Sequence, residues 1–356
     1  MKEGGRHFAS IVVLLVTLAS CGAFAASADS SALPAYAPDQ KIAGLIRTWG
    51  NPHMGGLLKN WQAGFKKFHP EIAFSDFLKG SASATYGFAE NVAELGLMGR
   101  QIYTFENYGI YRRSLMLPVE IEVATGSFNV PHKSFALAVL VHRDNPLARL
   151  TLAQLDGIFG DQRTGGWQGM VWEKSAARGR EKNIRTWGQL GLTGEWADQP
   201  IRLYGPPGLH AGGIGFFQRR VMGGSDIWAE GLMEFEDRQA MVAALAKDRY
   251  GIAYTGLNYV TPQVKPVALA EKDGDPFVAL TRENVASRIY PLSRPVYIYF
   301  APDTPGGEPA NPKTDPKVRE FLRYILSREG QADVAREGDY LPLTAPIARE
   351  QLKKLD

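Results

Sequence analysis

A glycine-rich junction at residues 202–222, RLYGPPGLHAGGIGFFQRRVM, has the composition of a ligand-binding turn. Apolar Ile201 and Leu203 predict a strand before the glycines, and Phe216 and Phe217 predict a helix after them. The first amide groups of a helix have no partner within that helix, and glycine lets a ligand come close to them. The chemistry expected of such a strand-to-helix junction is therefore the binding of an anion.

The junction lacks the signatures of nucleotide-binding loops. No Lys-Ser or Lys-Thr pair follows the glycines, as a P-loop requires, and the G-x-G-x-x-G spacing of a dinucleotide-binding turn is missing. A second interpretation stays open, in which Pro206 and Pro207 shape a surface turn and the glycines only tighten it.

The residues that could carry catalysis or hold a metal show no catalytic spacing. Cys21 is the only cysteine, so disulfides and thiolate metal sites are excluded from the mature chain. His53, His210 and Ser81 could be imagined as a hydrolytic set, but there is neither a G-x-S-x-G elbow nor an H-E-x-x-H motif. We therefore expect a protein that is not an enzyme and uses no cofactor or metal.

The N-terminus has the pattern of an export signal. Lys2 and Arg6 give a positive start, residues 8–19 are apolar, and small residues follow. Two processing routes remain open. Residues 23–25, Ala-Phe-Ala, have the A-x-A form of an ordinary cleavage site, whereas Leu-Ala-Ser-Cys ending at Cys21 resembles a lipobox that would leave this cysteine acylated. We expect membrane contact only through such a lipid.

Charge and length exclude several classes of protein. Removal of a leader at residues 1–25, which contains Lys2, Arg6 and Glu3, lowers the formal net charge from +3 to +2, too little to predict nucleic-acid binding. No later apolar run approaches the roughly 18 residues that a membrane span needs. About 330 mature residues suggest two domains. Residues 26–40 have the Ala/Ser/Pro composition of a flexible tether.

From residue 42 the sequence alternates short apolar runs with helical patterns, as an α/β protein does. Strands are predicted at 42–49, 72–78, 95–99, 135–141, 250–256 and 295–300. Helical patterns are found at 57–68, 85–93, 152–159, 216–221, 239–246 and 317–326.

Five stretches together match one known family in its own order and cover most of residues 42–345. They are VLVHRDNPLARLTLAQLDGIFGD (139–161), TWGQLGLTGEWADQPIRLYG (186–205), YGIAYTGLNYV (250–260), YPLSRPVYIYF (290–300) and FLRYILSREGQADVAREGDYLPL (321–343). Through them the chain resembles the phosphate-binding component of bacterial phosphate ABC importers, the PstS-like periplasmic solute-binding proteins.

The resemblance implies a two-lobe periplasmic-binding-protein fold of type II, in which each lobe is a mixed sheet flanked by helices. Two crossover strands, at 136–142 and 250–256, would join the lobes. Lobe I would then be discontinuous, 41–134 plus 256–356, and lobe II would be 135–255. The ligand would lie in the cleft, at strand ends and helix N-termini, and the lobes would close about a hinge.

The resemblance also places the glycine-rich junction in the cleft. In the family this segment carries an arginine and a Ser-Gly-Thr run that hold phosphate. Here the run aligns with Ala211-Gly212-Gly213, and the arginine position falls near Pro207. The backbone amides of Gly212, Gly213 and Ile214 remain as candidate ligands, with His210 in the same loop. Each charge-assisted hydrogen bond that is lost is worth about 1.5–3 kcal/mol.

The other lobe keeps part of the family's pattern. GSASAT at 80–85 resembles the serine/glycine turn of the family, so Ser81 and Ser83 are candidate ligands, or else caps of their own helix. Gly99 replaces the aspartate that accepts the proton of hydrogen phosphate. Arg100 follows as a candidate anion ligand or salt-bridging residue. His53, in the turn after the first strand, replaces a small hydroxyl residue and is a candidate ligand or a surface group.

The expected function is that of an exported, periplasmic solute-binding protein that captures phosphate or another small oxyanion, with an ABC permease as its partner. Because three family contacts are missing, we expect phosphate affinity to be lowered about a thousandfold, with little discrimination against sulfate. In the alternative, the same fold serves a sensory, scaffold or secretion-associated role with a degenerate phosphate site.

Overall fold

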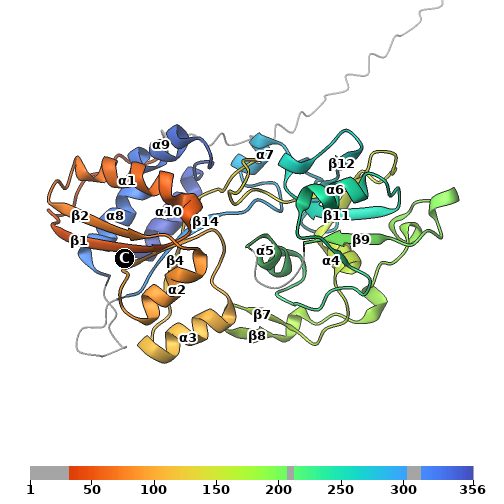
Figure 1. The fold of residues 1–356 in the computed structure, drawn as a ribbon, viewed down its shortest axis with the longest axis horizontal. Coiled ribbons are helices and arrows are strands. Elements are labelled where there is room, and N and C mark those ends of the chain that lie inside the picture. Colours follow the sequence, from red (N-terminus) through yellow and green to blue (C-terminus); the bar gives the residue numbers. More distant parts are fainter. Residues whose placement is uncertain (1–31, 207–211, 303–313, 356) are drawn as a thin grey trace, which may run out of the picture.

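The computed structural model describes residues 32–206, 212–302 and 314–355. The expected leader, 1–25, and His210 lie outside this part of the chain. Two separate five-stranded sheets, each with helices packed against it, lie side by side along the long axis of the molecule (Figure 1). The expectation of an α/β fold with two mixed sheets is confirmed.

The first sheet has the strand order β2-β1-β3-β14-β4. Its strands are β1 (Gly44–Gly50), β2 (Ile72–Phe77), β3 (Leu95–Met98), β4 (Val119–Ala124) and β14 (Val296–Phe300). β1, β2 and β3 are parallel, and β14 is antiparallel to β3 and β4. Its helices are α1 (Gly55–Lys66), α2 (Ser81–Ala89), α3 (Thr104–Ser114), α8 (Pro316–Ile325), α9 (Arg328–Glu337) and α10 (Ala345–Leu352). We call this part, residues 32–124, 296–302 and 314–355, the N-terminal lobe.

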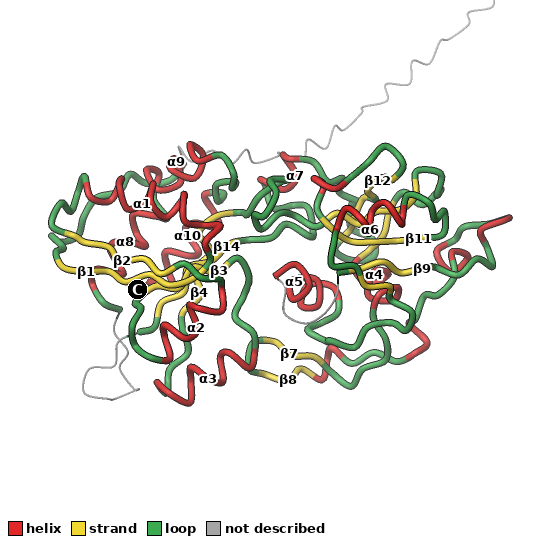
Figure 2. Tube along the Cα trace, viewed as in Figure 1, coloured by secondary structure: helices red, strands yellow, loops and turns green. Residues whose placement is uncertain are grey.

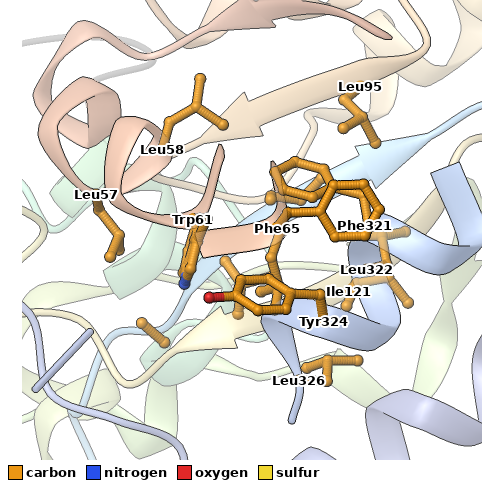
Figure 3. Close-up of a cluster of buried hydrophobic side chains, with 14 of the residues drawn as sticks. Leu57, Leu58, Trp61, Phe65, Leu95, Ile121, Phe321, Leu322, Tyr324 and Leu326 are labelled. Carbon is orange, nitrogen blue, oxygen red and sulfur yellow. The ribbon is translucent and has the colours of Figure 1, made fainter. Parts of the chain in front are cut away.

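The spacing of apolar residues explains how α1 covers this sheet. Leu58, Trp61 and Phe65 recur every three or four positions, so they share one face of the helix. All three are fully buried. Figure 3 shows Phe65 beside Phe321 of α8, and their ring centroids are 5.1 Å apart. Burial of each such side chain contributes about 1.5–3 kcal/mol to folding.

The second sheet has the order β10-β9-β11-β5-β12. Its strands are β5 (Ala138–His142), β9 (Arg202–Gly205), β10 (Met233–Glu234), β11 (Gly251–Thr255) and β12 (Val264–Pro266). The helices of this part are α4 (Leu152–Phe159), α5 (Gly212–Val221), α6 (Arg238–Leu245) and α7 (Arg282–Ala286). Two small ladders complete it, β6 (Arg149–Thr151) with β13 (Ala268–Ala270), and β7 (Gly166–Gln168) with β8 (Val171–Glu173). We call residues 138–206 and 212–292 the central lobe.

The chain crosses between the sheets at 125–137 and at 293–295, and both segments are irregular loops (Figure 2). The predicted crossover strands, at 136–142 and 250–256, instead form β5 and β11 inside the second sheet. After β11 the chain remains in the central lobe, because β12 pairs with β5 and the side chain of Leu292 lies in the same core. The predicted boundary at 255/256 is therefore corrected. β12 has only three residues and ends in proline, too short for an alternating pattern to reveal it.

Part of the expected tether, 26–40, packs against the N-terminal lobe. From residue 32 onward it is described, and Leu33 and Tyr36 are buried. The Tyr36 hydroxyl donates to the carboxylate of Glu320, at 2.7 Å. Two apolar anchors within an Ala/Ser/Pro-rich stretch are thus enough to fix residues 32–40 on the surface, which composition alone does not reveal.

Candidate functional site

A pocket of about 410 Å³ brings together four of the eight predicted site residues, Ser81, Arg100, Gly212 and Gly213. We call it the interlobe pocket, because its walls come from the N-terminal lobe, from both crossing segments and from α5 of the central lobe. Its walls are formed by Asn51, Gly80, Ser81, Ala82, Gly99, Arg100, His132, Lys133, Ser134, Gly212, Gly213 and Arg294.

Two helix N-termini meet at this pocket. α2 begins at Ser81, directly after Gly80, and α5 begins at Gly212, near the middle of the molecule in Figure 1. Gly80 is the N-cap residue of α2 and adopts a φ of 119°, a conformation that favours glycine. Because glycine has no side chain, it cannot cap the first amides of the helix. The first amides of both helices therefore remain free of intrahelical partners, and both positive helix ends favour an anion in the pocket.

Arg294 is the buried cation of the pocket. It is 6% exposed, and within the described part of the chain its guanidinium donates only to carbonyl oxygens, to Gly99 O at 3.2 Å and to Phe135 O at 3.5 Å. Among the described residues, no Asp or Glu forms an ion pair with it. Burial lowers the pKa of Arg294 to about 10, so it stays protonated at neutral pH. A buried charge of this kind needs a counter-ion, because desolvation without one is costly.

Glycine at position 212 lets this guanidinium approach the helix. A Cβ built on Gly212 would lie 3.1 Å from Nη2 of Arg294, and one built on Gly213 would lie 3.6 Å from Nη1. The positive end of α5 and the arginine consequently face the same space. Their combined field favours a negatively charged ligand more than either group alone.

The space expected to hold a carboxylate is filled at Gly99. A Cβ at this position would come within 2.4 Å of Asn51 Nδ2 and 2.8 Å of Ser134 Oγ. Ser134 donates to the Gly99 carbonyl at 2.9 Å, and the Gly99 amide donates to Ser81 Oγ at 3.2 Å. No Asp or Glu belongs to the described wall of the pocket.

The two predicted serines play different parts. Ser81 lines the pocket, and because its oxygen accepts from Gly99, its hydroxyl proton is left to donate to a ligand. Ser83 instead donates to the carbonyl of Gly80, at 2.8 Å, within its own turn. The local interpretation, a serine bonded to its own helix start, therefore describes Ser83.

Arg100 reaches the pocket wall, but its guanidinium is engaged elsewhere. It forms two hydrogen bonds of 2.7 Å with the buried carboxylate of Glu106 and lies over the ring of Tyr103, 4.1 Å from its centroid. The salt-bridge interpretation thus describes this conformation of Arg100. Its Cβ, rather than its charge, approaches Gly212.

The predicted histidine His53 lies beside the pocket instead of in its wall. Its exposed imidazole stacks on His132, with ring centroids 6.1 Å apart, and it is His132 that lines the pocket. Burial, followed by repulsion from His132 and Lys133, lowers the pKa of His53. Lys133 is itself paired with Glu337 and Asp339.

Of the predicted amide ligands, Gly212 and Gly213 line the pocket, whereas Ile214 is 1% exposed and lies behind them. His210, Pro207 and Ala211 lie outside the described residues. Arg294 lines the pocket but was not among the site residues predicted from the sequence. One signal could have found it: this arginine comes directly before the apolar run PVYIYF, and an arginine is rarely buried beside such a run unless it is paired.

Among the described residues, no group of three or more His, Cys, Asp or Glu side chains gathers in a way that could hold a metal ion. Within the same residues, no helix combines the length and the apolar composition that crossing a membrane requires.

Comparison with known proteins agrees with this geometry. Residues 54–329 match the PBP superfamily domain. The chain is 32% identical over 347 residues to the phosphate-binding protein PstS of Pseudomonas aeruginosa PAO1, which covers 96% of this chain and 97% of that protein. It is also 28% identical over 214 residues to protein SphX of Synechococcus elongatus, 59% of this chain and 54% of that one.

Two solved structures share the fold. PstS from Borrelia burgdorferi has a TM-score of 0.53 and 14% identity, covering 85% of this chain and 99% of the other. An ABC-type phosphate transport receptor from Vibrio cholerae has a TM-score of 0.51 and 19% identity, covering 83% and 99%. On the family match and the full-length relative, this chain belongs to the PBP superfamily and, within it, to the PstS-like solute-binding proteins, a family of binding proteins and not of enzymes.

Proposed function

We propose that this protein captures a small tetrahedral oxyanion, phosphate foremost, in the interlobe pocket and delivers it to an ABC permease. The observation that carries the proposal is Arg294, a buried guanidinium without a carboxylate partner among the described residues, placed where the N-termini of α2 and α5 meet. The name of the Pseudomonas relative supports phosphate as the ligand.

The pocket has the donors that a tetrahedral anion requires. Arg294 supplies a two-pronged guanidinium, the starts of α2 and α5 supply backbone amides, and Ser81 supplies a hydroxyl. Because the walls come from both lobes, closure around the ligand would exclude water and strengthen each of these contacts. Arg294 also supplies a guanidinium in place of the one that is missing at Pro207. A thousandfold weakening of phosphate affinity therefore no longer follows from the missing arginine.

Replacement of Arg294 tests the proposal. Two charge-assisted contacts at about 1.5 kcal/mol each predict that Arg294→Gln weakens phosphate binding at least a hundredfold in calorimetry at neutral pH. Arg294→Lys, which keeps the charge but not the planar fork, should bind with intermediate affinity. If Arg294→Gln binds phosphate as tightly as the wild type, the interlobe pocket is not the site.

The absence of a carboxylate from the described wall bears on selectivity. Hydrogen phosphate carries a proton that needs an acceptor, whereas sulfate carries none. The Gly99 carbonyl already accepts from Arg294 and Ser134, so it is a poor acceptor for that proton. We expect dissociation constants for phosphate and sulfate within about tenfold of each other in parallel calorimetric titrations. Phosphate binding with sulfate excluded would contradict this.

Export to the periplasm belongs to the same proposal. It is supported by the leader-like sequence at 1–25, which lies outside the described residues. Mass spectrometry of the native protein distinguishes cleavage after Ala25 from an acylated Cys21, and an intact N-terminus would contradict export. If the wild-type protein binds no oxyanion at all, the alternative of a sensory, scaffold or secretion-associated role is favoured.

A further inference from the structure

A second cavity lies between the two lobes, beside the β7–β8 hairpin. It has a volume of about 200 Å³, and both lobes contribute to its wall. We call it the hairpin pocket. Its wall includes Gln101, Leu117, Glu120, Trp167, Arg219 and Tyr299. It shares no wall residue with the interlobe pocket, so the two cavities are separate.

The hairpin closes one side of this cavity. Figure 1 shows β7 and β8 extending from the central lobe toward α3. Gly169, at the turn between the two strands, has a φ of 59°, and its carbonyl accepts from the hydroxyl of Thr104 at 2.5 Å. Thr104 is the first residue of α3, and both residues line the cavity. The hairpin pocket is therefore bounded by a direct contact between the lobes.

Arg219 of α5 brings a positive charge to the wall from the central lobe. Its guanidinium lies over the ring of Tyr103, 5.5 Å from the ring centroid. Its Nε is buried and has no hydrogen-bond partner among the described residues, and no carboxylate there forms an ion pair with it. The next residue, Arg220, is by contrast paired with Glu271. A partly desolvated guanidinium without a carboxylate favours an anionic group.

Glu120 of β4 brings a negative charge to the wall from the N-terminal lobe. Its carboxylate accepts from the hydroxyl of Tyr299 and from the side-chain amide of Gln101, at 3.1 Å. Both donors are neutral and line the same cavity, so the carboxylate lies at this wall. Within the described part of the chain, no Lys, Arg or His forms an ion pair with it. Glu120 consequently favours a cationic group.

These two charges select against ligands that carry only one charge. A simple anion is attracted by Arg219 but repelled by Glu120, and a simple cation has the opposite difficulty. A molecule with a carboxylate at one end and an ammonium at the other satisfies both. Leu117 adds apolar surface for methylene groups, and the indole of Trp167, packed edge-on against Trp172 at 5.2 Å, adds an aromatic ring that favours an alkylammonium. The cavity is smaller than the roughly 300–1,000 Å³ of pockets for drug-sized molecules, so the ligand must be small.

We propose that the hairpin pocket is a second ligand site, which binds a small zwitterion of the ω-amino acid type between the lobes. The carboxylate of the ligand pairs with Arg219, and its ammonium pairs with Glu120. This site is independent of the anion that is bound in the interlobe pocket.

Calorimetry at neutral pH with a series of small compounds tests the proposal. Glycine, γ-aminobutyrate and ε-aminocaproate carry both charges at increasing separation, whereas butyrate and butylammonium carry one charge each. We expect one of the three amino acids to bind at least about tenfold more tightly than either singly charged compound. If none of the amino acids binds, or if a singly charged compound binds as tightly, the proposal is overturned.

Two variants assign the charges of the ligand to their partners. Arg219→Gln and Glu120→Gln should each weaken binding of the preferred amino acid about tenfold or more. Each variant also removes one repulsion, so Arg219→Gln should bind butylammonium more tightly than the wild type does, and Glu120→Gln should bind butyrate more tightly. A merely structural loss would not produce this exchange of preference. Thermal unfolding verifies that both variants are folded.

A matched control is Arg220→Gln, which removes the neighbouring charge of α5 outside the pocket wall and should leave amino-acid binding unchanged. If both Arg219→Gln and Glu120→Gln bind the amino acid as the wild type does, the hairpin pocket is not its site. Arg294→Gln, which tests the interlobe pocket, should also leave amino-acid binding unchanged, so the failure of either site is recognised separately.

Discussion

At the scale of single residues, position 99 shows why a ligand cannot be inferred by exchanging one side chain for another. The family places an aspartate at this position, but here the space beside Gly99 is occupied by the amide of Asn51 and the hydroxyl of Ser134. The glycine is therefore part of a differently packed pocket floor. Its neighbours Asn51 and Ser134, rather than a carboxylate, line the described wall of the interlobe pocket.

Restoring the family's aspartate should consequently damage the protein. Gly99→Asp places a Cβ 2.4 Å from Asn51 Nδ2, so we expect a loss of about 1–3 kcal/mol in the free energy of unfolding, measured by urea titration. The control is Gly213→Ala in the same pocket, where the nearest atom to a new Cβ is 3.6 Å away, an ordinary contact. Equal stability of Gly99→Asp and the wild type would show that the floor can rearrange.

At the scale of elements, residues 32–40 form a strap across the helices of the N-terminal lobe. The Tyr36 hydroxyl lies 2.8 Å from His69 Nε2 and donates to Glu320, which is fully buried and also paired with Arg323 at 2.7 Å. Because the Ile42 amide donates to Nδ1 of His69, the imidazole proton lies on Nε2 and points toward Tyr36. The strap is thus fastened by a buried chain of hydrogen bonds.

Removal of the Tyr36 hydroxyl tests this fastening. Tyr36→Phe leaves His69 and Glu320 each short of a partner inside the protein, which typically costs about 1–3 kcal/mol. We expect a lower urea midpoint and faster amide hydrogen exchange at 32–42, with anion affinity unchanged because the strap does not line the interlobe pocket. Unaltered exchange in the strap would contradict the role of the hydroxyl.

The same network predicts a pH dependence. Burial lowers the pKa of His69 below its usual value of 6.5, although Glu320 opposes the shift. Below that usual value the unfolded chain binds a proton that the folded form does not, so the stability of the folded form should fall as the pH drops from 7 to 5. His69→Gln should flatten this slope in urea titrations.

At the scale of the whole molecule, the two lobes touch where Tyr103 of the N-terminal lobe fits closely against Gly215 of the central lobe. A Cβ on Gly215 of α5 would lie 2.6 Å from the ring of Tyr103 at the start of α3. The crossing segments are joined to each other near Leu137, whose amide donates to the Leu292 carbonyl at 3.1 Å. We propose that the lobes rotate as rigid bodies about 125–137 and 293–295 and that the Tyr103 contact marks the closed state.

A methyl group at Gly215 should therefore hold the lobes apart. We expect Gly215→Ala to weaken phosphate binding about tenfold and to reduce the ligand-induced decrease in radius of gyration seen by small-angle X-ray scattering. Gly109→Ala, in α3, is the matched control, because a Cβ there meets no atom within 4 Å. That control should bind normally and be slightly more stable, since alanine favours a helix over glycine. If Gly215→Ala shows the same ligand-induced decrease in radius of gyration as the wild type, the added methyl group does not hold the lobes apart.

The sequence by itself determined the α/β class, the family and the approximate positions of β1, β2, β3, β5, β9, β11 and β14 and of six helices, α1, α2, α4, α5, α6 and α8, because hydrophobic periodicity and family stretches depend on residues close together in the chain. It also located two of the pocket's contributors, the turn at Ser81 and the glycines at 212 and 213. Only the tertiary structure brought Arg294 to those glycines and kept residues 256–292 in the central lobe. These outcomes depend on contacts between residues far apart in the sequence, where a side chain's partner, and hence the fate of its charge, is set by packing and not by its neighbours in the chain.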